Sequence, residues 1–257
     1  MHTRSVELAE WLRERVTAAG ARGLVVGLSG GLDSAVVARL CQMAVPEDVL
    51  GVMLPCQSDP ADEADARLVA EHLGIPTLRI DLTAAYEGLT ADLTAATAGL
   101  TVQKRSPVPS DEIDQQRRAA LANVKPRLRM TCFYFLANSL DYLVAGTGNR
   151  CELTIGYFTK HGDGGVDLLP IGGLTKREVR ALAVDLQVPQ PILDKVPSAG
   201  LWLGQTDEEE MGFTYEQLER YLADGPEAVP PALALKIERL VRQNEHKRHM
   251  ADTPELP

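Results

Sequence analysis

The chain has 257 residues, of which 45% are hydrophobic, and its formal net charge at pH 7 is −10. This length suits one α/β domain with a full core, so we predict a single domain over residues 1–257. The acidic balance argues against a nucleic-acid-binding protein, which would usually present a basic face. The charged N-terminus is no signal peptide, and no apolar run approaches the roughly 18 residues of a membrane helix. We therefore expect a cytoplasmic protein with no nucleic-acid or membrane partner.

Helix-like and strand-like segments alternate in the first third of the chain. An apolar stripe at helical spacing predicts a core-packing first helix through Leu8, Trp11, Leu12 and Val16. Strand-like runs follow at 23–28, 49–55 and 75–81, with helical stretches at 33–43 and 60–73. Asp59 is a candidate N-cap for the latter helix, and Gly74 comes just after its end. Such alternation is typical of βαβ units with a buried parallel sheet.

The remaining segments are less regular. Residues 83–112 show no strand pattern, and we expect helix fragments with a mobile loop around 104–110. We also predict a helix after Pro126, a fourth strand at 142–146, a helix that a Thr175–Glu178 capping box begins, and two closing helices, the last at 231–246. The predicted fold is α/β, with a doubly wound, mainly parallel, Rossmann-like sheet flanked by helices.

Cysteines give no sign of a metal centre or a disulfide framework. Cys41, Cys56, Cys132 and Cys151 have neither CxxC nor other metal-like spacing. Scattered, mostly buried thiols suit a reducing cytosol, and this is what we expect.

A glycine-rich turn follows the first predicted strand and opens onto a helix. It comprises Gly27, Leu28, Ser29, Gly30, Gly31, Leu32, Asp33 and Ser34. Backbone N–H groups and the helix N-terminus favour an anion at such a turn, so we predict a phosphate site. The turn lacks the lysine of the P-loop and the spacing of GxGxxG. Because a carboxylate repels phosphate unless a cation lies between them, Asp33 implies Mg²⁺.

This lysine-free turn resembles the pyrophosphatase-type loop of the ATP pyrophosphatases, which belong to the adenine nucleotide alpha-hydrolase-like superfamily. The resemblance implies that the loop holds the β,γ-pyrophosphate of ATP as a leaving group, while AMP is transferred to an oxygen of the substrate.

A second block narrows the resemblance. It runs from Gly146-Thr147-Gly148-Asn149 through Glu152 and the stretch GYFTKHGDGGVD at 156–167 to Leu174-Thr175-Lys176. These residues are similar to the pattern of the ammonia-dependent NAD synthetases. Further matches are NVKPRLRM at 123–130, Pro197-Ser198-Ala199 and Glu245-His246-Lys247-Arg248. The resemblance covers nearly the whole chain. It departs at Ser198, where many relatives have threonine, and after Arg248, where proline comes later than usual.

The resemblance implies a role for each matching residue. ATP would be held by the loop residues 27–34 with Thr147, Lys176 and Ser198, and Mg²⁺ by Asp33 and Glu152 at two strand ends. Deamido-NAD would be held by Arg127, Lys160, Asp167, His246 and Lys247, and Tyr157 or Phe158 could stack on its pyridine ring. No separate catalytic nucleophile is implied.

The implied reaction is the last step of NAD biosynthesis and makes the protein a ligase. The substrate carboxylate attacks the α-phosphorus of ATP and releases pyrophosphate; ammonia then attacks the acyl-adenylate and AMP leaves. The chain has no room for a glutamine-using amidase domain, which favours free ammonia. Resemblance also implies a homodimer. We expect residues 197–213 to act as a lid that orders over bound ATP and deamido-NAD.

Two alternatives remain open at this stage. Another ATP pyrophosphatase, such as a tRNA thiolase or a guanylate-forming synthetase, would use the same loop, although a thiolase usually has paired cysteines and a basic face. A nucleotide-binding regulatory module without catalysis is the other, and the intact Asp33, Glu152 and Lys176 argue against it.

Overall fold

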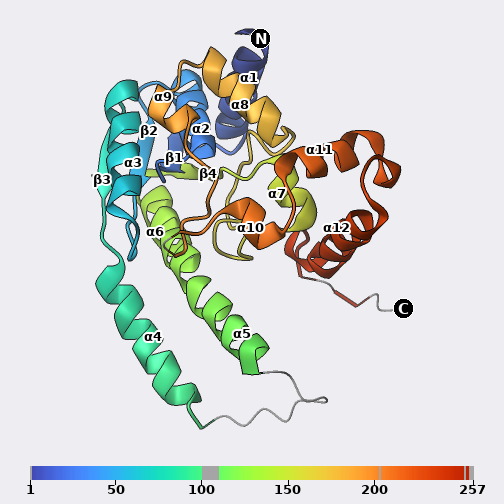
Figure 1. Cartoon of the computed structure of the whole chain (residues 1–257). Coiled ribbons are helices and arrows are strands. Elements are labelled where there is room, and N and C mark those ends of the chain that lie inside the picture. The colour runs from blue at the N-terminus through green and yellow to red at the C-terminus, as the bar shows by residue number, and fades with distance from the viewer. Residues whose placement is uncertain (1, 100–109, 203, 252, 255–257) are drawn as a thin grey trace.

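The computed structural model describes residues 2–99, 110–202, 204–251 and 253–254 (Figure 1). At its centre lies a parallel sheet of β1 (Gly23–Gly27), β2 (Val49–Met53), β3 (Thr77–Arg79) and β4 (Tyr142–Ala145). The strand order is β3-β2-β1-β4, so the winding direction reverses between β1 and β4. A ligand crevice is expected beyond the carboxyl ends of the strands at such a reversal. The predicted α/β class is confirmed.

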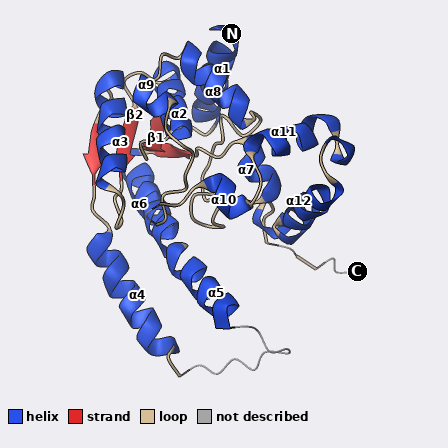
Figure 2. Ribbon diagram, viewed as in Figure 1, coloured by secondary structure: helices blue, strands red, loops and turns tan. Residues whose placement is uncertain are grey.

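Helices cover both faces of the sheet (Figure 2). On one face lie α1 (His2–Ala18), α2 (Leu32–Ala44), α3 (Pro60–Leu73), α8 (Lys176–Asp185) and α9 (Gln190–Leu193). On the other face lies α6 (Val124–Leu140). Successive strand side chains point to opposite faces, so Leu24 and Val26 join the first core and Val25 joins the second. The central strands β1 and β2 are therefore buried on both sides, as their continuous apolar runs predict, whereas the three residues of the edge strand β3 are exposed.

A third cluster of helices packs beside the sheet (Figure 1). It contains α7 (Arg150–Ile155), α10 (Asp207–Met211), α11 (Tyr215–Asp224), η1 (Pro226–Ala228), α12 (Pro231–Gln243) and η2 (Glu245–Lys247). Its apolar centre includes Ile155, Phe213, Leu218 and Ile237, each of them buried. This cluster brings residues 207–247 next to the segment that follows β4.

An arm of two helices, α4 (Thr83–Thr97) and α5 (Ser110–Ala122), extends away from this body (Figure 1). No residue of α4 is buried, and Leu89 and Leu93 are 42% and 44% exposed. Most of the predicted mobile loop at 104–110 lies outside the described residues. Among those described, no helix is both long and apolar enough to cross a membrane.

Most predicted boundaries are confirmed to within a few residues. Asp59 caps α3 by accepting from Ala61 N, and Gly74 ends it with a left-handed φ of 64°. Three expectations were wrong. The sixth helix begins at Val124 rather than after Pro126, because a proline in the first turn sacrifices no intrahelical donor. Residues 207–211 form a helix, although the stretch 197–213 has neither helical nor strand periodicity and was expected to be irregular. Trp11 is 36% exposed rather than in the core.

Candidate active site

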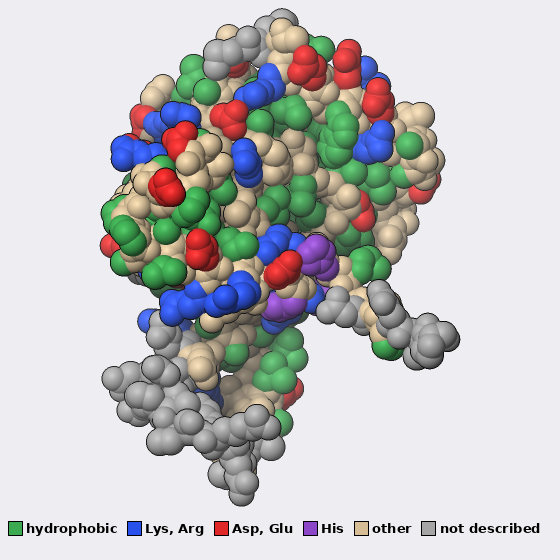
Figure 3. Space-filling view, turned by 90° about the vertical axis from the view of Figure 1, so that its right-hand side faces the viewer, with side chains coloured by type: hydrophobic (Ala, Val, Ile, Leu, Met, Phe, Trp, Pro, Cys, Tyr) green, Lys and Arg blue, Asp and Glu red, His purple; other side chains and the backbone are tan. Residues whose placement is uncertain are grey.

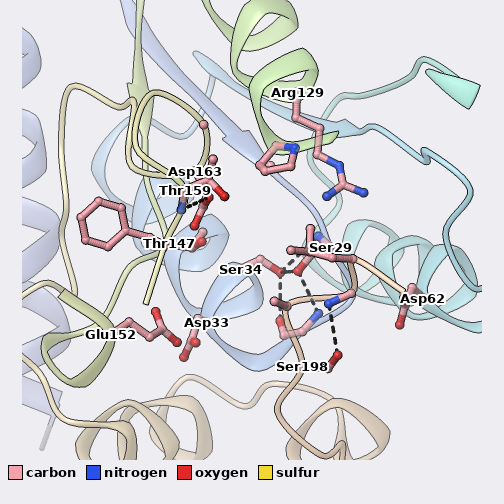
Figure 4. A pocket seen from close by; sticks show the side chains of 18 of the residues that line it. Ser29, Asp33, Ser34, Asp62, Arg129, Thr147, Glu152, Thr159, Asp163 and Ser198 are labelled. Carbon is pink, nitrogen blue, oxygen red and sulfur yellow. Dashed lines mark hydrogen bonds between the residues drawn. The ribbon is translucent and has the colours of Figure 1, made fainter. Parts of the chain in front are cut away.

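The glycine-rich loop connects β1 to α2, at the carboxyl edge of the sheet (Figure 4). The Ser34 hydroxyl donates to Gly31 O at 2.9 Å and accepts from Ser29 N at 3.3 Å, which closes the turn. Gly30 has a φ of 75°, and a Cβ there would lie 2.4 Å from Asp62 O. The loop therefore requires glycine at this position and is held in a fixed conformation against α3.

A pocket of about 520 Å³ opens above this loop. Seven of the eight predicted loop residues line it, the exception being Gly30. Thr147, Lys176 and Ser198 come from three distant parts of the chain and also line it. The structure thus brings all the predicted ATP-binding segments to one pocket.

Three charged side chains meet at one end of the pocket. Lys176 Nζ lies 2.5 Å from Asp33 Oδ2 and 3.8 Å from Glu152 Oε1. Burial raises the pKa of Glu152 to about 8, and the Asp33 charge adds to this effect. Burial alone would lower the pKa of Lys176, but Asp33 and Glu152 outweigh it and hold the pKa above its ordinary value. Lys176 therefore keeps its positive charge beside Asp33.

The donor set at this end fits Mg²⁺. Asp33 Oδ1 is buried and has no hydrogen-bond partner within the described part of the chain. Glu152 Oε2 accepts from Asn149 N in a capping box, which leaves Oε1 facing Asp33 and Lys176. Both carboxylates lie in the first turns of helices, α2 and α7, rather than at strand ends as expected. Among the described residues no group of three His, Cys, Asp or Glu has metal-site geometry, so a cation here would need phosphate or water oxygens as well.

The residues predicted to bind deamido-NAD divide into two groups. Lys247 lines the pocket and donates to Gly156 O and Phe158 O. Arg127, Lys160 and His246 lie outside it, on one exposed cluster. Both Arg127 contacts to Lys160 O are 3.3 Å, and Lys160 Nζ donates to His246 O. Figure 3 shows histidine, lysine and arginine side chains gathered on one face of the molecule.

Asp167 is engaged within the protein. Its Oδ1 accepts from Tyr134 OH at 2.9 Å, and its Oδ2 accepts from Val144 N at 2.8 Å. Asp167 N donates to Val144 O at 3.0 Å, and Gly146 N donates to Leu168 O at 2.8 Å. Asp167 therefore joins α6 to the free edge of β4, a role that the sequence did not indicate.

The sequence also missed two polar side chains in the pocket. The Arg129 guanidinium donates to Leu54 O and Ser58 Oγ, and Figure 4 places it above the loop. Asp163 accepts from Thr159 N at 2.9 Å, and burial raises its pKa. The signals were present in RLRM and GDGG, but spacing alone does not tell which charge of each motif faces a pocket.

The predicted lid is held at several points. Lys195, just before it, lies 2.7 Å from Asp62 Oδ1 and 2.6 Å from Asp65 Oδ2 on α3. The buried Lys125 amine donates to Leu201 O at 2.8 Å, and the Arg118 guanidinium is 5.9 Å from the centroid of the Trp202 ring. Beyond residue 206 the segment becomes α10, and its end is fixed because Met211 and Phe213 are buried. Only residues 197–206 are irregular, with Leu203 outside the described residues.

Comparisons with known proteins identify the family and the fold that this chain resembles. The family model described as NAD synthase matches residues 5–251. The NH(3)-dependent NAD(+) synthetase of Carboxydothermus hydrogenoformans is 49% identical over 97% of this chain and 96% of its own length. A solved NMN synthetase from Francisella tularensis is 36% identical with a TM-score of 0.86, covering 99% of this chain and 98% of that one. The NH3-dependent NAD synthetase of Campylobacter jejuni, solved with a nitrate ion, is 26% identical with a TM-score of 0.76, at 99% and 98% coverage.

Proposed function

This chain belongs to the NAD synthase family, and from that premise we propose that it ligates ammonia to deamido-NAD with ATP, forming NAD, AMP and pyrophosphate. The observation that carries the proposal is the convergence of the phosphate loop, Asp33, Glu152 and Lys176 on one pocket. Asp33 and Glu152 are acidic, so the site suits a polyphosphate that binds together with a divalent cation. It does not suit a carboxylate that binds without one.

The loop and the residues facing it bind the nucleotide. Ser29, Ser34 and the loop N–H groups hold the β- and γ-phosphates at the N-terminus of α2. Thr147 and Ser198 bind ATP from opposite walls, and Lys176 neutralises charge that develops on the leaving pyrophosphate. The substrate carboxylate is thereby aligned with the α-phosphorus, so alignment and electrostatics account for the first step without a protein nucleophile.

Asp33 and Glu152 would hold Mg²⁺. When bound, Mg²⁺ neutralises the phosphates and favours departure of pyrophosphate. The buried, unpartnered Oδ1 of Asp33 supports this assignment, since such an atom is costly unless it meets a cation or donor.

Arg127, Lys160, His246 and Lys247 form the proposed deamido-NAD subsite. The positive charges of Arg127, Lys160 and Lys247 suit the pyrophosphate and carboxylate of this substrate, and the ring nitrogens of His246 can hydrogen-bond to it. Asp167 belongs to the same proposal, because each of its oxygens keeps a further lone pair that can accept from a hydroxyl or amide. Tyr157 or Phe158 would stack on the pyridine ring.

A homodimer completes the proposal. The arm helix α4 buries none of its residues, and Phe135 on the neighbouring α6 is 70% exposed. An exposed apolar surface of this kind is typical of a protein interface. Arg127, one of the proposed deamido-NAD residues, lies on the same helix α6 as Phe135. We further propose that residues 1–257 act as one domain in the cytoplasm.

A deamidated mononucleotide is the second candidate substrate. It is favoured by the similarity to the Francisella tularensis NMN synthetase, which has the higher TM-score of the two structures compared. The two substrates share the reacting carboxylate and the adenylation chemistry, and they differ only in the distal adenylyl half.

The test is a product assay with ATP, Mg²⁺, ammonium and either deamidated nucleotide. We expect NAD from the dinucleotide at the higher kcat/KM, AMP and pyrophosphate as by-products, and much less product when glutamine replaces ammonium. Glu152→Gln should lower turnover by at least ~100-fold. Formation of ADP and phosphate would refute adenylation. A higher kcat/KM for the mononucleotide would show that the mononucleotide, rather than the dinucleotide, is the substrate.

A further inference from the structure

Tyr215 joins the helix α10 to the carboxylate that we assign to the metal. Its hydroxyl lies 2.8 Å from Asp207 Oδ2 on α10 and 3.3 Å from Glu152 Oε1 on α7. Lys176 Nζ lies 5.2 Å from the centroid of the Tyr215 ring. One side chain thus lies against three ionisable groups at the end of the nucleotide pocket, and no sequence motif predicts this role.

The hydroxyl of Tyr215 is buried between two acidic side chains, with Asp207 Oδ2 at 2.8 Å and Glu152 Oε1 at 3.3 Å. It has one proton, which these two acceptors share. A buried tyrosine of this kind needs a partner for its O–H, and here both available partners are carboxylates.

The position of this hydroxyl is rigidly determined. Tyr215 is 6% exposed, and its ring packs in the third core with Cys151, Phe213 and Leu218. Its backbone N donates to Glu208 Oε1 at 2.9 Å, and Thr214 caps α11 directly before it. The ring cannot move without disturbing the contact between α10 and α11.

Glu152 is held at both of its oxygens. Oε2 accepts from the N-cap Asn149 N at 3.1 Å, whereas Oε1 lies 3.3 Å from the Tyr215 hydroxyl and shares the one proton of that hydroxyl with Asp207. Rotation of the carboxylate about its last bond would break both contacts. Because Oε1 is the oxygen that lies 3.8 Å from Lys176 Nζ, which also contacts Asp33, this second contact determines where the lone pairs of Oε1 point.

The other side of the bridge reaches the segment above the pocket. The Tyr157 hydroxyl directs its one proton to Glu210 Oε2 at 2.7 Å and lies 3.3 Å from Asp207 Oδ1. Glu210 Oε2 in turn accepts from Gln205 Nε2 at 2.6 Å. Polar contacts therefore run without interruption from residue 205 to Glu152.

We infer that Tyr215 is a positioning residue for Glu152, and that it makes the affinity for Mg²⁺ depend on the placement of α10. The inference rests on the proposed function, because it assigns Glu152 to Mg²⁺. Groups that orient metal ligands in this way typically contribute about 10- to 100-fold to metal affinity. Here the Tyr215 bridge would link the placement of α10 to the affinity of Glu152 for the ion.

The test is a Mg²⁺ titration of the full chain in the presence of a fixed concentration of a non-hydrolysable ATP analogue, followed by calorimetry. Tyr215→Phe keeps the ring and removes the hydroxyl, and we expect its apparent Kd for Mg²⁺ to rise by about 10-fold or more. Binding of the analogue in EDTA should not change. Excess Mg²⁺ should restore kcat to within about threefold of the wild type, a rescue that a purely structural defect would not show.

Two further variants make the outcome decisive. Tyr221→Phe removes a hydroxyl from a ring in the same core and should leave the Mg²⁺ titration unchanged. Asp207→Asn weakens the bridge from the α10 side and should raise the apparent Kd in the same direction, which keeps the test available if Tyr215→Phe does not fold. Wild-type Mg²⁺ affinity in either bridge variant overturns the inference. If the wild type itself shows no Mg²⁺-dependent binding, the metal assignment in the proposed function fails with it.

Discussion

Glu152→Gln should stabilise the metal-free protein at alkaline pH although it removes a side chain that the reaction needs. The pKa of Glu152 is about 8 in the folded protein, against an ordinary value of 4.5, with burial as the first cause and Asp33 as the second. Below pH 4.5 both states hold the proton. Between pH 4.5 and about 8 the unfolded state loses the proton while the folded state keeps it. The free energy of unfolding therefore falls as the pH rises through this interval.

The magnitude follows from the interval between the two values. The free energy of unfolding falls by about 1.4 kcal/mol per pH unit over about 3.5 units, which amounts to about 5 kcal/mol by pH 9. The Glu152 side chain is only 16% exposed, so solvent screens little of this cost. Glutamine resembles the protonated acid and avoids the loss, while its carbonyl can still accept from Asn149 N.

The assay is urea denaturation in EDTA at pH 5.5 and pH 9. The stability advantage of Glu152→Gln should be small at the lower pH and should reach several kcal/mol at the higher one, with a Tm difference of at least about 6 °C. Glu216→Gln, whose side chain is 73% exposed, should change stability by less than about 0.5 kcal/mol at either pH. An advantage of the same size at both pH values would refute the reasoning, because it could not come from titration of Glu152.

Three further predictions concern the loop and the lid. Asp33→Asn should lower turnover by at least ~100-fold, as measured by AMP release, and should also lower the Tm, because it removes the charged partner of the buried Lys176 amine; a near-wild-type rate at limiting Mg²⁺ would contradict the metal assignment. Gly30→Ala should cost at least about 1 kcal/mol of stability and weaken ATP binding about tenfold, because its Cβ meets Asp62 O; unchanged denaturation and ATP titration would contradict this. Lys125→Met should speed chymotryptic cleavage near Leu201 in the free protein. ATP, Mg²⁺ and deamido-NAD together should suppress that cleavage, and equal resistance with and without them would exclude a lid.

The strands, their parallel arrangement and the loop could be predicted from the sequence because each depends on local pattern. Leu24, Val25 and Val26 alternate between the two faces of the sheet and are all apolar. Gly30 has the backbone freedom that the turn requires. The capping box at Thr175 is confirmed for the same reason, since its two hydrogen bonds join residues three apart.

Contacts between distant segments could not be predicted in this way. The Tyr215 hydroxyl meets a residue 63 positions earlier, and Lys125 meets the carbonyl of a residue 76 positions later. Neither has a local signature, because tyrosine and lysine at those places fit an ordinary helix equally well. Asp167 was singled out by resemblance, yet its hydrogen bonds to Tyr134 and Val144 depend on how α6 and β4 pack.

The closure of the β4 edge by residues 167–168 also bears on aggregation. An open edge strand presents unpaired N–H and C=O groups to which a strand of another molecule can add. Here Val144 and Gly146 direct theirs to Asp167 and Leu168 of the same chain. Protection of this edge therefore depends on a segment made after β4 itself, and a nascent chain that ends before residue 167 exposes it. Substitutions that detach Asp167 should for that reason appear first as a loss of soluble protein at high concentration, before any change in the secondary structure of the monomer.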